Sequence, residues 1–381
     1  MTFGLLGDHA EILSGFAFKS DAFNTDGNGT PLIRIRDVMP GRTSTFFDGE
    51  FDNRFLIGSG EILIGMDGDF NRARWASVPA LLNQRVCKIS AHTKLDDGYL
   101  YYLLPQILKV ISDRTAFVTV KHLSAKDLRE TEIPLPPLEE QKRIAGILDQ
   151  ADTLRRLRTR ALDKLNTLGQ AIFHEMFGDG ANTEKAWPIV ELADLIAEDD
   201  RISYGVVQPG DHDPKGIPLI RVADLAAPLI NFDEVKRVSN QIDYEYSRSR
   251  LRGGEILIGC VGSIGTAIIA PKSFEGSNIA RAVARVSIDP NRCNPAFLLQ
   301  FIKSDEVQRY FTKEVRLVAQ PTLNIKQIRE TKVPLPPREL QDAFASRIGN
   351  VLSSKTALVS ASKSTESLFA SLQHRAFRGE L

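Results

Sequence analysis

Short runs of apolar, often β-branched residues recur along both halves of the chain, most of them close to Gly, Pro or Asp, and they predict β-strands. The runs are 32–35, 62–64, 85–89, 219–222 and 284–288. Longer stretches with helical spacing lie at 99–110 and 295–311. This arrangement predicts mixed α+β domains rather than a doubly wound sheet.

The most regular apolar pattern in each half follows a pair of prolines, at 136–137 and at 336–337. Proline is tolerated at the first position of a helix but not inside it, and Glu139 and Glu140 suit a first helical turn. Apolar residues then recur at four- and three-residue spacing, which predicts one long helix per half with a coiled-coil seam. The first predicted seam is Ile147, Ala151, Leu154, Ala161, Leu165, Leu168 and Ile172, with Arg158 as its one charged position. The second is Val351, Ser354, Leu358, Ala361, Thr365, Leu368 and Leu372.

Because both seams are imperfect, we expect the two helices to pair with each other as an antiparallel coiled coil. About 40 residues at ~1.5 Å per residue give a rod of about 60 Å, long enough to hold two globular domains a set distance apart. The alternative is two helices that each pack on their own domain, as in ordinary bundles.

The chain contains an internal repeat. The segment 129–137 (RETEIPLPP) recurs at 329–337 (RETKVPLPP) with a shift of 200 residues, which also carries His174 and Phe177 onto His374 and Phe377. Upstream, 31–37 corresponds to 218–224 with a shift of 187, and GEILIG at 60–65 recurs at 254–259 with a shift of 194. The shift changes from 187 to 200 residues along the first part of each copy and is then constant, so the two copies differ by insertions and deletions only in that first part. Each half is therefore predicted to be a variable globular domain followed by a segment of fixed length.

The composition is that of a soluble globular protein, with 43% hydrophobic and 25% charged residues, and 381 residues suit two domains. Three cysteines without a Cys-x-x-Cys pair predict neither a disulfide framework nor a zinc site, which fits a reducing cytoplasm. The first residues lack a basic region ahead of an apolar stretch, and no run approaches about 18 apolar residues, so we expect no export signal and no membrane span. Basic and acidic residues are equal, at 48 each, so net charge gives no long-range attraction to nucleic acid.

No segment carries the pattern of a catalytic centre. The string nearest to a methyltransferase tetrad, 294–297 (NPAF), lacks the second proline, and Asn followed by Pro suits the start of a helix. A nuclease needs carboxylates and a lysine around a metal, and Asp224, Glu234 and Lys236 match this only in residue type, a combination that is common by chance. No phosphate-binding Gly-x-x-x-x-Gly-Lys loop occurs in the sequence. His174 and His374 lie near predicted helix C-termini, where a cation or a cap is expected.

Basic residues at alternating positions predict strand faces that contact nucleic acid. The glycine-bearing loops 66–71 and 260–265 would let the backbone approach a DNA groove. The candidate DNA-binding residues are Lys19, Arg34, Arg36, Gly68, Asn71, Arg72, Arg74, Arg221, Arg248, Arg250, Arg252 and Ser263. Taken alone, such a pattern more often belongs to a solvated strand face whose basic residues pair with nearby acids.

Taken together, these features resemble the specificity subunits of type I restriction-modification systems, over nearly the whole chain. The residues that carry the resemblance are 14–20 (SGFAFKS), the repeated Pro-Leu-Ile-Arg and Gly-Glu-Ile-Leu-Ile-Gly strings, both Pro-Leu-Pro-Pro elements and 139–148 (EEQKRIAGIL). The Pro-Leu-Pro-Pro-x-x-x-Gln junction into a long helix occurs twice. The second helix keeps Gln341 but continues as Asp-Ala-Phe where the first has Lys-Arg-Ile.

The resemblance implies a non-catalytic, cytoplasmic subunit with an α+β fold, in which two target-recognition domains are joined by two long helices as a pseudo-two-fold repeat. The recognition domains would span 1–133 and 179–333, and the spacer helices 134–178 and 334–381. The partners it implies are double-stranded DNA carrying a bipartite asymmetric site, two modification subunits and a restriction subunit. This chain is expected to bind no cofactor itself. S-adenosylmethionine, ATP and Mg²⁺ would belong to the partner subunits, which methylate adenine and cleave DNA.

Two other functions fit parts of the sequence. A two-lobed coiled-coil scaffold that binds other proteins would explain the rod and the neutral charge, but not the alternating arginines or the paired glycine loops. The recognition half of a single-chain methylating nuclease is the enzymatic alternative, and the lack of a catalytic segment argues against it.

Overall fold

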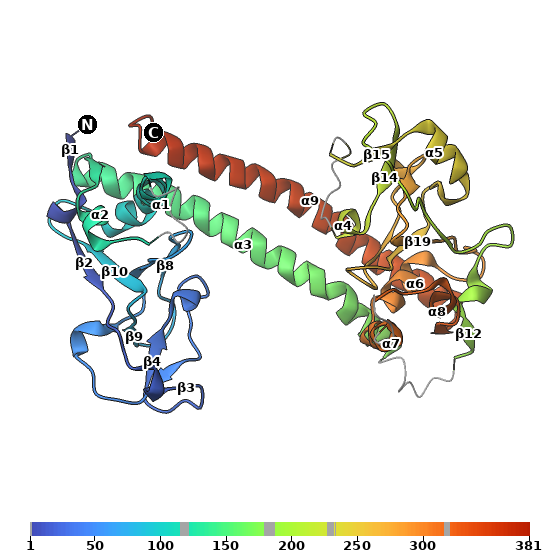
Figure 1. Cartoon of the computed structure of the whole chain (residues 1–381), viewed down its shortest axis with the longest axis horizontal. Helices are drawn as coiled ribbons and strands as arrows, with labels where there is room; N and C mark the ends of the chain where they lie inside the picture. The colour runs from blue at the N-terminus through green and yellow to red at the C-terminus, as the bar shows by residue number, and fades with distance from the viewer. Residues whose placement is uncertain (1, 115–121, 179–186, 227–231, 233, 316–320) are drawn as a thin grey trace. The chain divides into compact units, whose positions relative to one another are not determined.

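The structure is a computed structural model that describes residues 2–114, 122–178, 187–226, 232, 234–315 and 321–381. The chain divides into two compact units (Figure 1). Unit 1 comprises Met1–Leu157 and Lys363–Leu381, and unit 2 comprises Arg158–Ser362. Both boundaries fall inside long helices, so each unit is a globular part together with segments of two helices.

The globular part of unit 1 is built around a four-stranded antiparallel sheet with the order β2-β10-β7-β8. A five-stranded sheet (β3-β5-β4-β9-β6) and a two-stranded ribbon (β1-β11) complete it. The strands are β1 (Thr2–Leu5), β2 (Ala10–Ser14), β3 (Phe23–Asn24), β4 (Thr30–Ile33), β5 (Phe46–Phe47), β6 (Leu56–Ile57), β7 (Ile62–Gly65), β8 (Arg72–Arg74), β9 (Ala80–Leu82), β10 (Val86–Ala91) and β11 (Glu132–Leu135). The helices are α1 (Asp97–Arg114) and α2 (Ala125–Arg129).

Unit 2 repeats this plan with a four-stranded sheet in the order β13-β19-β16-β17, a three-stranded sheet (β15-β14-β18) and a ribbon (β12-β20). Its strands are β12 (Ile189–Glu191), β13 (Ser203–Tyr204), β14 (Ile217–Ile220), β15 (Arg237–Val238), β16 (Ile256–Gly259), β17 (Ala267–Ile269), β18 (Asn278–Ile279), β19 (Val283–Val286) and β20 (Lys332–Pro334). Its short helices are α4 (Val222–Leu225), α5 (Asn240–Glu245), α6 (Pro295–Ile302), α7 (Asp305–Val315) and α8 (Ile325–Arg329).

The two four-stranded sheets match strand for strand and residue for residue. Leu63 lies opposite Lys88 in unit 1, and Leu257 lies opposite Arg285 in unit 2. Each sheet is also followed by helices on which its apolar face packs, α1 in unit 1 and α6 and α7 in unit 2. The prediction of two mixed α+β domains related by an internal repeat is confirmed.

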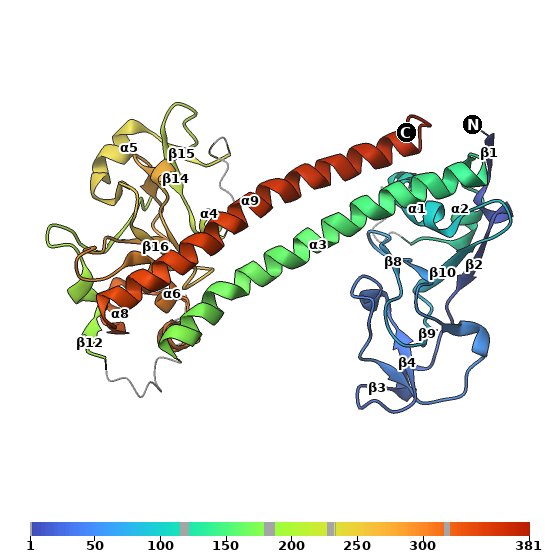
Figure 2. The same ribbon diagram turned by 180° about the vertical axis from the view of Figure 1, so that it is seen from behind.

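The long helices are α3 (Leu138–Phe177) and α9 (Arg338–Ala376), and they pack together within each unit (Figures 1 and 2). In unit 1, Ile144 near the start of α3 belongs to the same apolar core as Phe369 near the end of α9. In unit 2, Phe173 near the end of α3 contacts Phe344 near the start of α9, with ring centroids 5.5 Å apart. The start of one helix meets the end of the other, so the predicted antiparallel pairing is confirmed.

The predicted seam is wrong at four positions. Leu154, Leu168, Ser354 and Leu368 are exposed, whereas Asp152 and Phe369, close to two of them, are buried. An α-helix has 3.6 residues per turn, so its buried stripe drifts away from a strict seven-residue repeat over this length. The other apolar seam positions are partly buried, namely Ile147, Ala151, Ala161, Leu165, Ile172, Val351, Leu358, Ala361 and Leu372.

Element boundaries also differ from the expectations in two places. The stretch 295–311 forms two helices, because α6 ends at Ile302 and the carbonyl of Ser304 accepts the Gln308 N–H that begins α7. The first long helix begins at Leu138 rather than at Pro137, whose carbonyl accepts the first helical N–H groups. Among the described residues, no helix has the length and apolar character of a membrane span.

Candidate nucleic-acid interface

Two equivalent hairpin loops extend from the four-stranded sheets. Residues 66–71 join β7 to β8, and 260–266 join β16 to β17. Gly68 and Gly262 hold the same place in the two loops, with φ of +73° and +76°, a conformation that side chains with a Cβ rarely adopt. A Cβ at either position would meet nothing within 4 Å, so the glycines are needed for the backbone turn and not for space.

Each loop is fixed at its base by a contact with a later segment. Asp67 forms a β-bridge with His122, and its carboxylate lies 2.7 Å from His122 Nδ1 and 3.3 Å from the Arg85 guanidinium. In unit 2, Val261 forms the corresponding bridge with Thr322. The candidate residues Asn71 and Ser263 are exposed on these loops. The two loops therefore share the glycine turn at Gly68 and Gly262, but they differ in length by one residue and expose different side chains.

The prediction that arginines 34 and 36 share a strand face is wrong. Strand β4 ends at Ile33, and residues 35–37 form a 3₁₀ turn because the Asp37 carboxylate accepts the Arg34 N–H at 2.9 Å. Arg34 is exposed, and Arg36 lies 3.9 Å from Asp37. In unit 2, residues 247–249 also form a 3₁₀ turn, so arginines 248, 250 and 252 do not lie on a strand either.

Arg72 and Arg74 do share one face of a strand, as predicted, but that face points to helix α1. The Arg72 guanidinium lies 3.7 Å from the Tyr101 ring centroid, and that of Arg74 lies 4.8 Å from it. Burial lowers the pKa of Arg72, although Tyr101 and Asp152 oppose this effect. Arg72 therefore packs inside unit 1, and Arg74 donates to the carbonyl of Gly60.

Three further candidate arginines are engaged by acids within unit 2. Arg221 pairs with Asp224 at 3.3 Å, and Arg252 lies 3.9 Å from Asp200. Arg250 pairs with the buried Asp243, which also accepts from Asn278 Nδ2 at 3.0 Å. These three arginines therefore pair with nearby acids, which is the alternative interpretation of the alternating basic residues.

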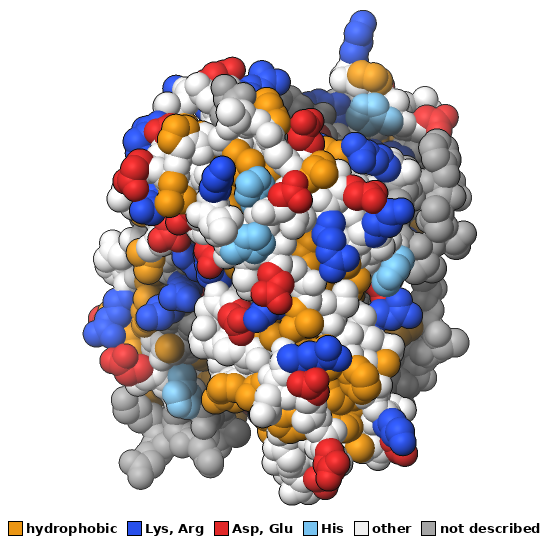
Figure 3. All heavy atoms as spheres, turned by 90° about the vertical axis from the view of Figure 1, so that its left-hand side faces the viewer, with side chains coloured by type: hydrophobic (Ala, Val, Ile, Leu, Met, Phe, Trp, Pro, Cys, Tyr) orange, Lys and Arg blue, Asp and Glu red, His pale blue; other side chains and the backbone are white. Residues whose placement is uncertain are grey.

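Four candidate cations are exposed without an ion pair in the part of the chain that the structure describes, namely Lys19, Arg34, Arg74 and Arg248. Of these, Arg74 donates to backbone carbonyls and lies over Tyr101. Figure 3 shows one face of unit 1, where basic and acidic side chains are intermixed and hydrophobic side chains gather in the lower part. The face carries no field of a single sign, in keeping with the neutral net charge.

Arg54 is a candidate that the sequence reasoning missed. It lies in the 3₁₀ turn Asn53–Phe55 of unit 1, and Arg248 lies in the turn Ser247–Ser249 of unit 2. Both turns precede the repeated GEILIG string, and the same shift of 194 residues relates the two arginines. The Arg54 side chain is 65% exposed and its guanidinium lies 4.6 Å from the Phe55 ring centroid. Extending the repeat a few residues upstream would have found it.

The glutamates of the repeated GEILIG strings are structural. Glu61 pairs with Lys88 at 2.8 Å, and Glu255 at the equivalent place lies 3.5 Å from Arg285. Each carboxylate also accepts a backbone N–H from the turn before its strand, at 2.6 and 2.7 Å. In unit 2, Arg285 also binds Asp200 at 2.5 Å, and all three side chains are buried.

The glutamine of each Pro-Leu-Pro-Pro-x-x-x-Gln junction connects the globular part of its unit to the long helix. Gln141 is 1% exposed, accepts the Asp96 N–H at 2.9 Å, and donates to the carbonyls of Lys94 and Pro136. Gln341 likewise accepts the Asn294 N–H at 2.9 Å. Asp96 and Asn294 start α1 and α6, so the motif joins two helices in each unit.

The segments examined for catalysis have structural roles. Asn294 caps α6 by accepting the Ala296 N–H, as the sequence predicts. All three cysteines are buried, and burial raises the pKa of each thiol to about 12. No group of three or more His, Cys, Asp or Glu side chains that could hold a metal occurs among the described residues.

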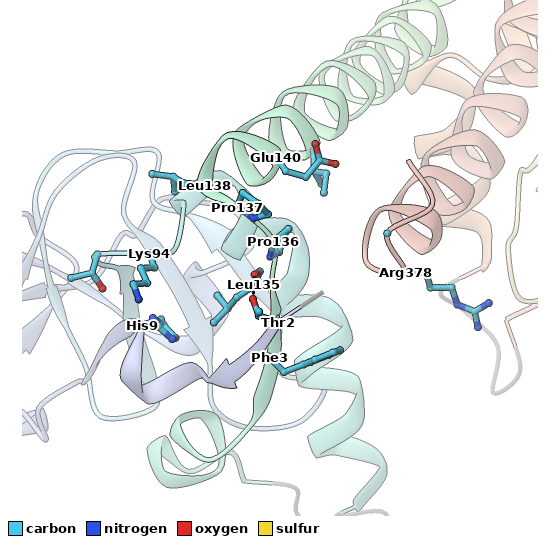
Figure 4. A pocket seen from close by; sticks show the side chains of 13 residues that line it. Thr2, Phe3, His9, Lys94, Leu135, Pro136, Pro137, Leu138, Glu140 and Arg378 are labelled. Atoms are coloured by element: carbon cyan, nitrogen blue, oxygen red, sulfur yellow. Dashed lines mark hydrogen bonds between the residues drawn. The ribbon is translucent and has the colours of Figure 1, made fainter.

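A cavity of about 1040 Å³ lies in unit 1 beside the junction of β11 and α3. Its lining residues come from several elements, including Phe3 on β1, Pro136 in the junction and Glu140 on α3 (Figure 4). The walls combine apolar residues such as Leu135 and Ile144 with the ionisable His9, Lys94, Glu140 and Arg378.

Comparison with known proteins connects this geometry to a function. The sequence profile of the type I restriction modification DNA specificity domain matches twice, over residues 1–167 and 187–365. The chain belongs to the family of type I restriction-modification specificity subunits. It is thus a DNA specificity subunit, a recognition component of its system rather than a catalytic one.

Individual relatives agree with this assignment. The chain is 37% identical to the type I restriction enzyme EcoBI specificity subunit of Escherichia coli, covering 98% of this chain and 84% of that protein. It is 22% identical to the MjaVIII specificity subunit of Methanocaldococcus jannaschii over 90% of this chain and 80% of the relative. The fold is similar to the crystal structure of a type I S subunit from M. genitalium, with a TM-score of 0.64 and 16% identity over 99% of this chain and 96% of the other.

Proposed function

We propose that this specificity subunit reads a bipartite, asymmetric DNA site, with one half-site contacted by each recognition domain. The observation that carries the proposal is the pair of hairpin loops, which share a backbone conformation at Gly68 and Gly262 but expose different side chains beside them. One scaffold with two different surfaces is suited to two different half-sites. The recognition domains are residues 1–133 and 179–333, and the boundary at 179 lies outside the described residues.

The exposed basic residues of the two domains are the first candidates for DNA contact. Arg34 lies directly before the 3₁₀ turn Ile35–Asp37 and Arg248 lies in the turn Ser247–Ser249, where a guanidinium can bind a phosphate or a guanine edge. Arg54, in the turn Asn53–Phe55, is exposed as well but pairs with the exposed Asp52 at 3.1 Å, a pairing that DNA would replace. Lys19, Asn71 and Ser263 are exposed on loops of the same domains. Arg36, Arg74, Arg221, Arg250 and Arg252 are candidates only if DNA replaces their present partners, and the half-buried Arg72, which packs on Tyr101, is the weakest.

The long helices act as a ruler between the half-sites, and the subunit docks two modification subunits and a restriction subunit. Helix α3 has 40 residues, about 60 Å at ~1.5 Å per residue. We assign S-adenosylmethionine, ATP and Mg²⁺ to the partner subunits, as the family resemblance implies. Because its net charge is zero, the isolated chain should bind DNA weakly and in a salt-sensitive manner.

The test is to express the chain with the modification subunit encoded beside it and to map adenine methylation by single-molecule sequencing. We expect a bipartite asymmetric motif that is present only when both chains are expressed. A palindromic motif would contradict the proposal that the two recognition domains bind different half-site sequences. No motif from a soluble assembled complex would contradict the proposal as a whole.

A further inference from the structure

Unit 2 contains a cavity of about 770 Å³ between β17, α6 and the long helices. Its walls are largely apolar, with Leu162 on α3, Ile268 on β17 and Val359 on α9. Two lysines, Lys303 and Lys355, also line it, and neither ammonium group has an ion pair among the described residues. Although the Lys303 side chain is exposed overall, partial desolvation at the cavity lowers the pKa of its ammonium group, and the charge of Lys355 lowers it further. The cavity therefore combines an apolar interior with two uncompensated cations.

The equivalent place in unit 1 is filled by the chain's own side chains. Arg72 on β8 lies opposite Ile64, and Ala267 on β17 lies opposite the equivalent Ile258, so the two correspond. Tyr101 and Leu299 also correspond. Asp96 donates its N–H to Gln141 and Asn294 donates its N–H to Gln341, and Tyr101 and Leu299 each follow the donor by five residues. In unit 1 the Arg72 guanidinium stacks on Tyr101 at 3.7 Å. Unit 2 has Ala267 and Leu299 there, and the space is open.

The unit 2 cavity also has fewer acidic residues around it than the equivalent place in unit 1. The shift of 200 residues carries Arg155 onto Lys355 and Asp152 onto Leu352. In unit 1, Arg155 pairs with Asp152 at 2.7 Å. In unit 2 the cation is kept, but the acid is replaced by Leu352, which is 53% exposed. Exposed apolar surface beside an unpaired cation is the pattern of an interface whose partner supplies the acid.

A second acidic residue of unit 1, on helix α9, has a neutral counterpart on helix α3 of unit 2. Glu366 lies 3.6 Å from Arg155 in unit 1, and the residue 200 positions earlier is Asn166, which lines the unit 2 cavity. Unit 1 is therefore self-neutralised and packed, whereas unit 2 retains a cationic, open recess on the same scaffold. The difference between the units identifies what a partner must bring: apolar side chains and at least one carboxylate.

We propose that this cavity anchors one modification subunit, which inserts apolar side chains flanked by a carboxylate between Lys303 and Lys355. Because Arg72 and Tyr101 fill the equivalent place in unit 1, the two modification subunits are held with unequal strength. The inference rests on the proposed docking of two modification subunits. A DNA phosphate is the competing occupant, but the apolar walls suit a protein segment better than a backbone of charged phosphates.

The test uses the full chain titrated with its modification subunit and counted by mass photometry. The first variant, Lys303→Ala with Lys355→Ala, removes both cations, and the second, Leu352→Asp, restores the acid that unit 1 has. Lys313→Ala is the control, because Lys313 is an exposed lysine of unit 2 outside this cavity. Circular dichroism confirms folding, and all mutated side chains except that of Lys355 are exposed.

We expect the wild-type chain and the control to bind two modification subunits. Both test variants should weaken the binding of one copy about tenfold or more and leave the other unchanged, since desolvated charge pairs dominate such contacts. Two copies bound by the variants with wild-type affinity would overturn the inference while leaving the proposed function intact. Unchanged stoichiometry with weaker, more salt-sensitive DNA binding would assign the lysines to DNA and also overturn it. A wild-type chain that binds no modification subunit would refute the proposed function together with this inference.

Discussion

Replacing Arg285 by methionine should destabilise unit 2 far more than the matched change destabilises unit 1. Arg285 is 3% exposed and lies between two buried acids, 2.5 Å from Asp200 and 3.5 Å from Glu255. The matched residue is Lys88, which holds the same place on the equivalent strand and pairs with the half-buried Glu61 at 2.8 Å. The two sites share geometry and differ in burial.

The expected magnitudes follow from that difference. Removing one partner of a buried ion pair leaves an uncompensated charge and costs about 3–5 kcal/mol. Arg285→Met takes the buried cation from two carboxylates, of which Asp200 keeps only the more distant Arg252 at 3.9 Å. Exposed pairs are worth only about 0–1 kcal/mol, and the Lys88–Glu61 pair, with side chains 20% and 31% exposed, lies between these limits. We therefore expect the free energy of unfolding to fall by about 3–5 kcal/mol for Arg285→Met and by about 1–2 kcal/mol for Lys88→Met.

The loss should also depend on pH. Burial raises the pKa of Asp200, but the hydrogen bonds and charge of Arg285 lower it below its usual value. In the wild type, this pairing stabilises the fold above the unfolded pKa of about 4 and is lost as the pH falls through the lower folded value. In the variant the contributions of Arg285 are absent and only the hydrogen bonds from Arg201 and Ser287 still oppose burial, so the pKa of Asp200 rises relative to the wild type and protonation relieves the buried charge. The difference between variant and wild type should be full at pH 7 and shrink towards pH 4.

The chain has two tryptophans, Trp75 in unit 1 and Trp187 in unit 2, so fluorescence can report each unit. Urea unfolding would be followed through Trp187 in a Trp75→Phe background for Arg285→Met, and through Trp75 in a Trp187→Phe background for Lys88→Met. Each variant is compared with its own background at pH 7 and pH 4.5. Equal losses at the two sites, or a loss at Arg285 that does not change with pH, would refute the reasoning.

Three further changes have definite expected outcomes. Arg34→Ala should reduce the slope of log K against log salt for DNA binding by the assembled complex by about 0.9, measured by fluorescence anisotropy, whereas Arg72→Ala should leave that slope unchanged. Gln141→Leu leaves the Asp96 N–H without its partner and should lower the free energy of unfolding by about 1–3 kcal/mol in chemical denaturation. Gly205→Ala should abolish soluble expression, because its Cβ would lie 1.7 Å from the Ile279 carbonyl oxygen, while Gly146→Ala, with nothing within 4 Å, should raise the melting temperature.

The sequence predicted the long helices and the repeat well because both depend on local patterns. The proline pairs, the periodic apolar residues and Gly178 place α3 to within a few residues of its observed bounds. The seam was less predictable, because the residues that pack, such as Phe369, depend on the phase in which two helices meet. A heptad pattern alone does not determine that phase.

The arginines were predicted less well, since their roles depend on contacts between distant segments. Alternation correctly placed Arg72 and Arg74 on a strand, but only the packing of α1 shows that Tyr101 covers them. Likewise, Asp243 and Arg250 are brought together by a turn, and the alternating basic residues of the sequence do not predict the conformation of that turn. The exposed Arg54 was accessible from the sequence, because the repeat that carries it onto Arg248 is visible there.

The central claim is that each recognition domain reads one half-site independently. The most direct measurement replaces residues 179–333 with a second copy of 1–133 and maps adenine methylation in cells that also express the modification subunit. The account predicts that one half-site of the wild-type motif is retained and that the other becomes its inverted copy, so that the motif turns palindromic. A motif in which both half-sites change, or in which neither does, would contradict it.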